Sequence, residues 1–446
     1  MKTNHLIPLL LALLTLGACV SPQDEATDCQ ECNEQQIVIK LASDNAPATR
    51  AGRPLTSNQP NQDVDRVMLI VCGNDENNKN TIVYTKLLTH WMTTSDIYID
   101  QNNRRGRTDR VRLREEERLD EGKYKVYAIA YTYKEDDTSN QTQYKVDDEG
   151  LNEYCESLEI GGTFNDNLIL SLTNAPGEEL FAGSQEFTVY DTGFTTQVVL
   201  NRQVAGIYLY VEDIPYYEGL AKLRLMPAAD NDGLVLGQFA NEDIAENGQE
   251  TKGLYVMNGT NAKATTEDKQ PLCEIKLADW LGENGVRKDG NLVSTENWKQ
   301  PEDYYPKEKY AFKEGSFFGG SFVIPFAASE TTTTNSLEIQ LIKDDDSVIK
   351  DKKWRVTLPP ADLTKQTNIY YWENNAFITT SSVTESVTNY SLLRNHLYYI
   401  GYKSTDKNAE QDIPQSLYDQ VDIQLKVIAE WDIIYDMVLE PDSSRQ

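Results

Sequence analysis

The stretch VDIQLKVIAEWDIIYDMVL runs from Val421 to Leu439 and alternates between apolar and mostly polar residues. This two-residue period predicts β structure with one buried face. At about 3.3 Å per residue, one strand of this length would be about three times longer than usual. We therefore expect either two strands that meet at a bend near Ala429 and Glu430, or one segment that extends beyond its own domain. The apolar face consists of Val421, Ile423, Leu425, Val427, Ala429, Trp431, Ile433, Tyr435, Met437 and Leu439.

Two positions for this segment fit the pattern. It can form a last hairpin that closes a C-terminal domain, or it can pair with the open sheet edge of another chain. Only seven residues follow Leu439, so we expect its far end to be untethered, which suits pairing with another chain. Periodicity alone leaves both positions open.

Short apolar segments separated by turn-rich clusters continue along the rest of the chain. The run DRVMLIVCG at 65–73 is apolar throughout its centre, as a central strand would be. We predict an all-β fold of two stacked β-sandwich domains of the transthyretin-like or Greek-key type, at 36–195 and 196–446. Short helices are expected around Leu151 to Leu158 and near Ser416 to Tyr418. Further strands are expected at 36–42, 80–88, 110–119, 122–133, within 180–212, and at 221–227, 273–279, 316–326, 336–343, 352–359 and 396–403.

Residues 1–18 have the pattern of a secretory signal peptide. Lys2 is followed by an apolar run from Leu6 to Leu16, which is too short to span a bilayer. The sequence LGAC that ends at Cys19 resembles the lipobox of bacterial lipoproteins, in which the cysteine becomes the lipidated first residue. The acidic segment 19–35 is expected to be a flexible tether, and its start resembles the surface-export signal of Bacteroidetes lipoproteins.

Residues 43–63 are rich in Asn, Pro, Thr and Ser, a composition typical of an exposed loop that proteases cut. Arg50, followed by Ala51, lies in the middle of this loop. Cys29 and Cys32 in the preceding tether lack the second pair of ligands that a zinc site needs. We expect a local disulfide or a chance pair there.

The chain carries 42 Lys and Arg against 71 Asp and Glu, for a net charge of −29. Phosphate binding needs a basic face, so nucleic acid is not an expected partner. His90 and His396 are the histidines after the signal peptide, and neither lies in a motif for nucleophilic catalysis, metal hydrolysis or nucleotide binding. We predict no catalytic residue, cofactor or metal site, and a protein that is not an enzyme.

Two surface features each have a functional and a structural interpretation. The arginine-rich segment from Arg104 to Arg118 can dock an acidic neighbour or form a salt-bridged hairpin, and the hairpin is favoured because surface charge runs seldom carry function. The side chains of Trp91, Trp280, Trp298 and Trp372 can offer stacking platforms for glycans or fill the core. Aromatic residues more often pack inside a protein.

Several stretches together resemble the fimbrillin family, the subunits of the type V pili of Bacteroidales. Residues 201–207, NRQVAGI, are similar to the family's Arg-x-Val-Ala signature at the start of the second domain. Residues 394–398, RNHLY, are similar to its Arg-Asn-His-x-Tyr motif before the last strands. The C-terminal repeat with Trp431 is similar to its donor segment. With the lipobox, the first strand at 36–42 and Arg50 in a loop, the resemblance spans the whole chain.

This resemblance implies assembly by strand exchange. The subunit would reach the outer membrane as a lipoprotein through Cys19, and an arginine-specific or trypsin-like protease would cut after Arg50. The strand 36–42 would then leave, and the segment 421–439 of another subunit would fill its groove by β-augmentation. On this basis donation to another chain is favoured over a local hairpin. The expected locations are the outer membrane and the fimbrium, and the alternatives are an uncleaved anchor subunit and a glycan-binding surface lipoprotein.

Overall fold

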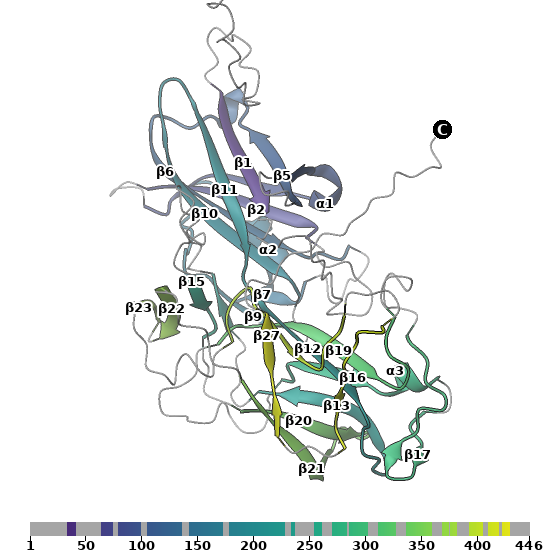
Figure 1. Ribbon diagram of the computed structural model, residues 1–446. Helices are drawn as coiled ribbons and strands as arrows, with labels where there is room; N and C mark the ends of the chain where they lie inside the picture. The colour runs from purple at the N-terminus through teal and green to yellow at the C-terminus, as the bar shows by residue number, and fades with distance from the viewer. Residues whose placement is uncertain are drawn as a thin grey trace, which may run out of the picture.

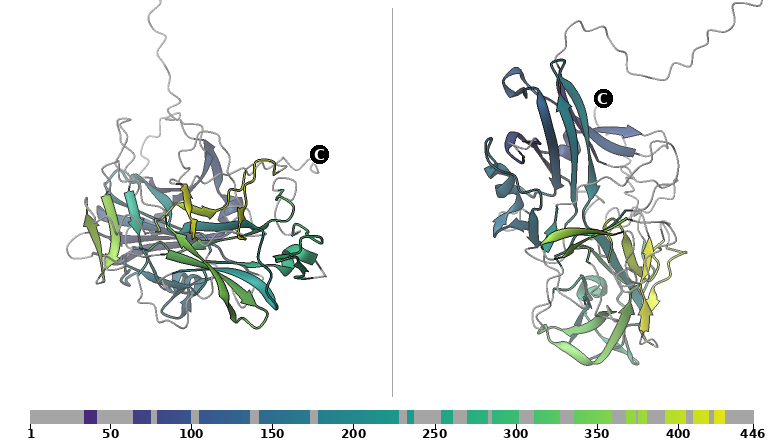
Figure 2. Two further views of the ribbon diagram at one scale, coloured as in Figure 1. Left: turned by 60° about the horizontal axis from the view of Figure 1, so that its bottom comes forward. Right: turned by 90° about the vertical axis from the view of Figure 1, so that its left-hand side faces the viewer.

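The structure is a computed structural model in which strands dominate, so the predicted all-β, multi-sheet fold is confirmed. Two halves are stacked end to end (Figures 1 and 2), with the strands up to β11 in one half and most later strands in the other. The structure describes residues 34–41, 64–74, 79–99, 105–135, 142–172, 178–227, 233–236, 254–260, 270–282, 285–301, 311–326, 336–358, 368–373, 375–380, 392–404, 409–418 and 422–428.

The N-terminal half is built on one eight-stranded sheet with the order β3-β2-β6-β10-β11-β1-β5-β4. β10 and β11 pair only through Phe181 and Ala182 of β10. Beyond this pairing, side chains of β2, β6 and β10 share one core with side chains of β1, β5 and β11. Gly183 lies at the division, where an added Cβ would clash with the carbonyl oxygen of Val199. The strands are β1 (Gln35–Leu41), β2 (Arg66–Gly73), β3 (Ile82–Leu88), β4 (Asp96–Ile99), β5 (Arg105–Arg112), β6 (Gly122–Tyr131), β10 (Leu180–Val189) and β11 (Phe194–Arg202).

β2 shows why a continuous apolar run becomes a central strand, because all its residues are buried. Leu69 points into the core that β1, β5 and β11 share. Ile70 points the other way, into a second core. That second core is covered by β7 (Tyr144–Val146), α2 (Leu151–Ser157), β9 (Ile169–Leu172) and β14 (Gly233–Val235), and β8 (Glu149–Gly150) pairs with β7.

Two five-stranded sheets form the C-terminal half around a single core that includes Trp280 and Trp354. One has the order β19-β12-β24-β27, with β25 also paired to β12, and the other has the order β16-β13-β20-β21-β26. Their strands are β12 (Ala205–Glu212), β13 (Leu220–Met226), β16 (Cys273–Lys276), β19 (Phe317–Val323), β20 (Ser336–Lys343), β21 (Val348–Thr357), β24 (Leu397–Ile400), β25 (Gln415–Ser416), β26 (Asp422–Gln424) and β27 (Lys426–Ile428).

The passage between the halves is short, since β11 ends at Arg202 and β12 begins at Ala205. β14 comes later in the chain but pairs with β9 of the N-terminal half. None of the described helices is long and apolar enough to cross a membrane. The smaller elements are α1 (Trp91–Thr94), η1 (Glu115–Glu117), α3 (Ala278–Leu281), β15 (Leu254–Met257), β17 (Lys288–Asp289), β18 (Leu292–Val293), β22 (Asn368–Glu373) and β23 (Ala376–Thr380).

Two local predictions are wrong, whereas the helix expected near 151–158 is confirmed as α2. The helix expected near 416–418 is replaced by β25, because Gln415 and Ser416 pair with the end of β12. The strand expected at 110–119 ends at Arg112. A 3-10 turn follows it, and the side chain of Glu117 accepts hydrogen bonds from the backbone N–H and the guanidinium of Arg114.

Candidate functional site

β1 is the candidate functional element because of where it lies. It pairs in parallel with β11 and antiparallel with β5 along nearly its whole length, as Figure 1 shows. Its side chains alternate as in a strand with one core face: Ile37, Ile39 and Leu41 are fully buried, and Lys40 is half-buried. The first described strand therefore fills a space between two strands that are distant from it in sequence.

Side-chain contacts fix the N-terminal end of β1. The amide of Gln35 donates from Nε2 to the carbonyl oxygen of Leu119 at 2.8 Å, and its Oε1 accepts from the Leu119 N–H at 2.7 Å. Glu34 forms an ion pair with Arg112 at 2.9 Å, which contributes about 0–1 kcal/mol because both side chains are exposed. The buried glutamine contacts therefore set the register of β1 more firmly than the ion pair does.

Tyr98 anchors the C-terminal end of β1. The hydroxyl of Tyr98 donates to the carbonyl oxygen of Leu41 at 3.2 Å, and Lys40 Nζ lies 5.3 Å from the centroid of the Tyr98 ring. The predicted processing residues Arg50 and Ala51, which follow β1, lie outside the described residues. Cys19, Cys29 and Cys32, which precede it, also lie outside them.

Loss of β1 would leave an apolar groove in the N-terminal half. Burying a side chain such as Ile37, Ile39 or Leu41 contributes about 1.5–3 kcal/mol, and this contribution would be lost at three positions. The backbone groups of β5 and β11 that now pair with β1 would also lose their partners. The empty groove is therefore unfavourable, and a replacement strand with alternate apolar residues would be strongly stabilised there.

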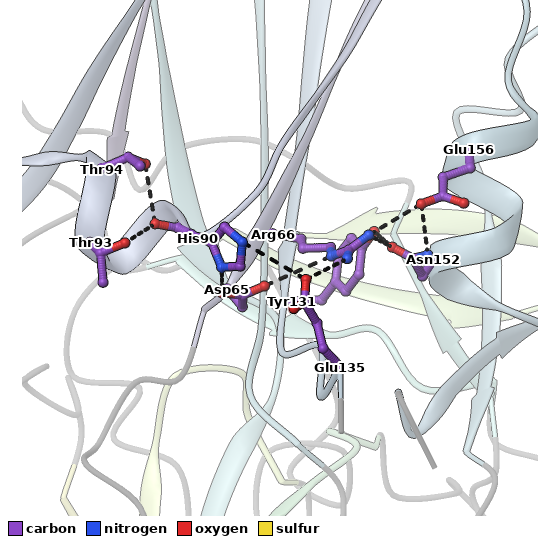
Figure 3. A network of polar contacts seen from close by, with 9 residues as sticks. All are labelled: Asp65, Arg66, His90, Thr93, Thr94, Tyr131, Glu135, Asn152 and Glu156. Carbon is purple, nitrogen blue, oxygen red and sulfur yellow. Dashed lines mark hydrogen bonds and ion pairs between the residues drawn. The ribbon is translucent and has the colours of Figure 1, made fainter. Parts of the chain in front are cut away.

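Arg66 fixes the start of β2 (Figure 3). Its Nη1 donates to Asn152 Oδ1 at 2.8 Å and lies 3.2 Å from Glu156 Oε1. Its guanidinium carbon lies 3.5 Å from the centroid of the Tyr133 ring, and 9% of its side chain is exposed. β2 is thus tied to α2 by contacts that do not involve β1, so removal of β1 would leave these contacts in place.

His90 extends this network to the surface, in the arrangement drawn in Figure 3. Its Nδ1 lies 3.6 Å from Asp65 Oδ1, and its Nε2 lies 3.8 Å from Glu135 Oε1. Because 56% of the histidine side chain is exposed, these pairs contribute little. No group of His, Cys, Asp and Glu suited to a metal ion occurs among the described residues. We assign the network a structural role, which the sequence pattern did not reveal because its members are far apart in the chain.

The segment predicted as a donor strand is described only up to residue 428. β26 pairs in parallel with β21, and β27 pairs antiparallel with β24, so the chain passes from one C-terminal sheet to the other. Ile423 and Leu425 are 3% and 1% exposed and belong to the core of their own half. Leu425 separates β26 from β27, and the bend predicted near Ala429 lies outside the described residues.

This arrangement corrects the prediction for the first part of the segment. Ile423 and Leu425 are core residues of the subunit itself, and the backbone of Val427 pairs with Tyr398. Donation to another subunit is therefore expected only of residues after 428. The remaining predicted donor residues lie outside the described residues: Val421, Trp431, Ile433, Tyr435, Met437 and Leu439.

The two short motifs at 201–207 and 394–398 meet at the passage between the halves. Arg202 donates from Nε to Glu179 Oε1 at 2.8 Å and from Nη1 to Asn395 Oδ1 at 3.0 Å. The side chains of Arg202 and Glu179 are 2% and 3% exposed. The Asn395 N–H also donates to the carbonyl oxygen of Val204 at 3.0 Å. These contacts join the end of β11 to the residues that precede β24.

Arg394 and His396 complete this junction. Arg394 Nη1 donates to Gln203 Oε1 at 3.4 Å, and Gln203 Nε2 donates to the carbonyl oxygen of Ala182 at 3.3 Å. His396 Nδ1 lies 2.8 Å from the carbonyl oxygen of Arg394. Because a carbonyl only accepts, this nitrogen carries the proton, and burial lowers the pKa of His396, which favours the neutral ring. The motif therefore joins the halves.

The tryptophans proposed as glycan platforms are mostly core residues. The exposed fractions are 0% for Trp91, 2% for Trp280 and 6% for Trp372. Trp298 is partly buried, and its Nε1 donates to the carbonyl oxygen of Ser316 at 2.6 Å. A ring that is enclosed on both faces offers no stacking surface, so these residues do not support the glycan-binding alternative.

The described part of the arginine-rich segment is mainly structural. Arg107 is 4% exposed and donates from Nη1 to the hydroxyl of Ser95 at 3.2 Å. Arg112 pairs with Glu34 beside β1, and Arg114 contacts Glu117 within the 3-10 turn. The favoured interpretation as a salt-bridged hairpin agrees with these contacts.

No family model matches the chain, and no curated protein matches it. Among solved structures, the chain is similar to the fimbrial anchor protein Mfa2 from Porphyromonas gingivalis, at 10% identity and a TM-score of 0.31, over 78% of this chain and 95% of that chain. It is also similar to a fimbrial assembly protein from Parabacteroides distasonis, at 10% identity and a TM-score of 0.34, over 77% and 93%. A Bacteroides thetaiotaomicron protein described as a candidate polysaccharide-binding protein gives 12% identity and a TM-score of 0.35, over 84% and 93%.

These names agree with the fimbrillin resemblance. Because the TM-scores are low, the likeness by itself carries no argument about what this chain does.

Proposed function

We propose that the chain is a structural subunit of a cell-surface fimbria, which is exported as a lipoprotein, cleaved in its N-terminal loop and polymerised by strand exchange. One observation carries this proposal: β1, the first described strand, lies inside the first sheet between β11 and β5, and the predicted loop at 43–63, which contains Arg50, joins it to β2. A cut in that loop separates the strand from the fold it completes. No enzymatic role is proposed.

The proposed sequence of events begins at Cys19, whose lipid anchors the precursor in the outer membrane. An arginine-specific or trypsin-like protease cuts between Arg50 and Ala51. The released segment contains β1, and the groove between β5 and β11 is then filled by residues after 428 of another subunit. The odd-numbered residues Trp431, Ile433, Tyr435, Met437 and Leu439 supply the alternate apolar side chains that replace Ile37, Ile39 and Leu41.

A donor strand can pair with both walls of the groove whichever way it runs. β1 is parallel to β11 and antiparallel to β5, so β5 and β11 run in opposite directions. Any replacement strand therefore makes one parallel and one antiparallel ladder, whichever way it runs. The hydrophobic face of the donor sets its register, because a slip of one residue would turn that face away from the core.

The cleavage step predicts a defined N-terminus. We expect protein purified from the cell surface to begin at Ala51, and the variant Arg50→Ala to keep residues 19–50 and stay out of fibres. N-terminal sequencing and intact mass measure this, with Arg53→Ala as the matched control that leaves the cut unchanged. A wild-type surface protein that still carries β1 would contradict cleavage and would favour the uncleaved anchor subunit.

The lipoprotein step predicts that Cys19 is the lipidated residue. The variant Cys19→Ala should accumulate as a precursor that keeps its apolar Leu6–Leu16 segment and takes up no labelled palmitate. Cys29→Ala, ten residues further along the tether, is the control and should label like the wild type. Palmitate labelling of Cys19→Ala at the wild-type level would contradict this assignment.

A further inference from the structure

A buried amine and a buried carboxylate meet near the end of the C-terminal half. Lys403 follows β24, and Asp412 precedes β25. Lys403 Nζ lies 3.0 Å from Asp412 Oδ1 and 3.0 Å from Oδ2, and neither side chain has any exposed surface. Nothing in the proposed fimbrial function uses this pair.

Other groups hold the carboxyl group in place from several sides. The hydroxyl of Tyr210 donates to Asp412 Oδ2 at 2.7 Å. Ser404 donates to Oδ1 from its backbone N–H at 2.8 Å and from its hydroxyl at 2.6 Å. Lys403 Nζ lies 5.2 Å from the centroid of the Phe312 ring. The amine and the carboxyl group are therefore fixed against each other in a site with an aromatic wall.

Burial changes the chemistry that such a pair can undergo. Two full charges without solvent are costly, and transfer of one proton from the ammonium to the carboxylate gives a neutral amine and a neutral carboxylic acid. A neutral amine is a nucleophile, whereas an ammonium is not. Contact at 3.0 Å supplies the proximity that makes a reaction between two neighbouring groups effectively intramolecular.

We propose that Lys403 and Asp412 form an intramolecular amide bond after the chain folds. Nζ adds to the carboxyl carbon of Asp412, a bond between Nζ and Cγ forms, and one carbon–oxygen bond of the carboxyl group breaks. The departing oxygen leaves as water with two hydrogens from the original ammonium group, so the ion pair becomes an amide plus one water molecule. No oxidant, reductant or co-reactant is needed.

The hydrogen-bond donors fit this reaction. As Nζ adds to Cγ, negative charge develops on the carboxyl oxygens, and fixed donors at these positions stabilise it. Tyr210 donates to one oxygen and Ser404 donates to the other. The inference does not rest on the proposed fimbrial function, because it follows from the contacts within one folded chain.

Peptide mass spectrometry of the full-length folded protein, denatured and digested with trypsin, tests the bond. Trypsin does not cut after an amidated lysine, so we expect a branched species in which 395–407 is joined to 408–426, lighter than the two peptides together by one water. Fragmentation should place the branch at Lys403 and Asp412.

The variant Lys403→Arg is the matched control, since a guanidinium keeps the positive charge but does not form this amide. It should give separate peptides 395–403, 404–407 and 408–426. Because the wild-type digest decides the matter, the test holds even if a variant folds poorly. A wild-type digest that contains only these separate peptides would overturn the proposal and leave the pair as a buried ion pair.

Discussion

The variant Ile39→Asp is expected to unfold the N-terminal half of the uncleaved precursor. Ile39 lies at the centre of β1, is fully buried, and pairs with Val198 on one side and Asp109 on the other. An unpaired carboxylate at this position costs several kcal/mol, which is comparable to the total stability of a typical domain. Chemical denaturation followed by circular dichroism and tryptophan fluorescence measures the loss.

The matched control for this prediction is Lys40→Gln, one residue further along the same strand. Lys40 is half-buried on the opposite face, and we expect a change within about 0.5–1 kcal/mol. Equal losses of stability for the two variants would contradict the sidedness of β1, and with it the idea that alternate side chains define the groove.

The second large effect is expected at the junction between the halves. Arg202→Met removes the guanidinium that contacts both Glu179 and Asn395. It leaves the carboxylate of Glu179, which is 3% exposed, without this partner. Breaking a buried pair in this way costs about 3–5 kcal/mol. Thermal and urea unfolding of the full-length chain measure the effect.

Two further variants identify the cause of that loss. Arg202→Met combined with Glu179→Leu removes both charges and should recover part of the stability. Lys353→Met removes an exposed pair with Glu338, at 2.8 Å and with 64% of the lysine side chain exposed, and should cost about 0–1 kcal/mol. If Arg202→Met has as small an effect as Lys353→Met, the junction does not hold the halves together in the way described.

The strands themselves could be predicted from the sequence, because side-chain period and turn composition are local properties. The run at 65–73 contains β2, which is buried on both faces, and the alternation at 36–42 covers all of β1 except its first residue. The partners of β1 could not be predicted. Its register with residues 194–200 and 107–112 depends on the whole first sheet, and no period in the segment encodes these distant neighbours.

The candidate site shows the same limit of local patterns. The motifs at 201–207 and 394–398 were recognised separately, and only the fold reveals the contact between Arg202 and Asn395. Arg66 and its partners carry no sequence signal, since Asn152 is far from it in the chain. Alternation correctly identified Ile423 and Leu425 as buried. The same alternation fits a strand in the subunit's own core and a strand donated to another subunit. The pattern alone therefore could not distinguish these two positions.

The central claim is that residues after 428 of one subunit fill the groove that β1 leaves in another. A photoreactive phenylalanine analogue at Tyr435, in fibres assembled from a mixture of isotopically heavy and light subunits, tests this claim most directly. We predict cross-links between heavy and light chains that map to β5 (Arg105–Arg112) or β11 (Phe194–Arg202). Cross-links found only within one chain, or only to the C-terminal half of a neighbour, would contradict it.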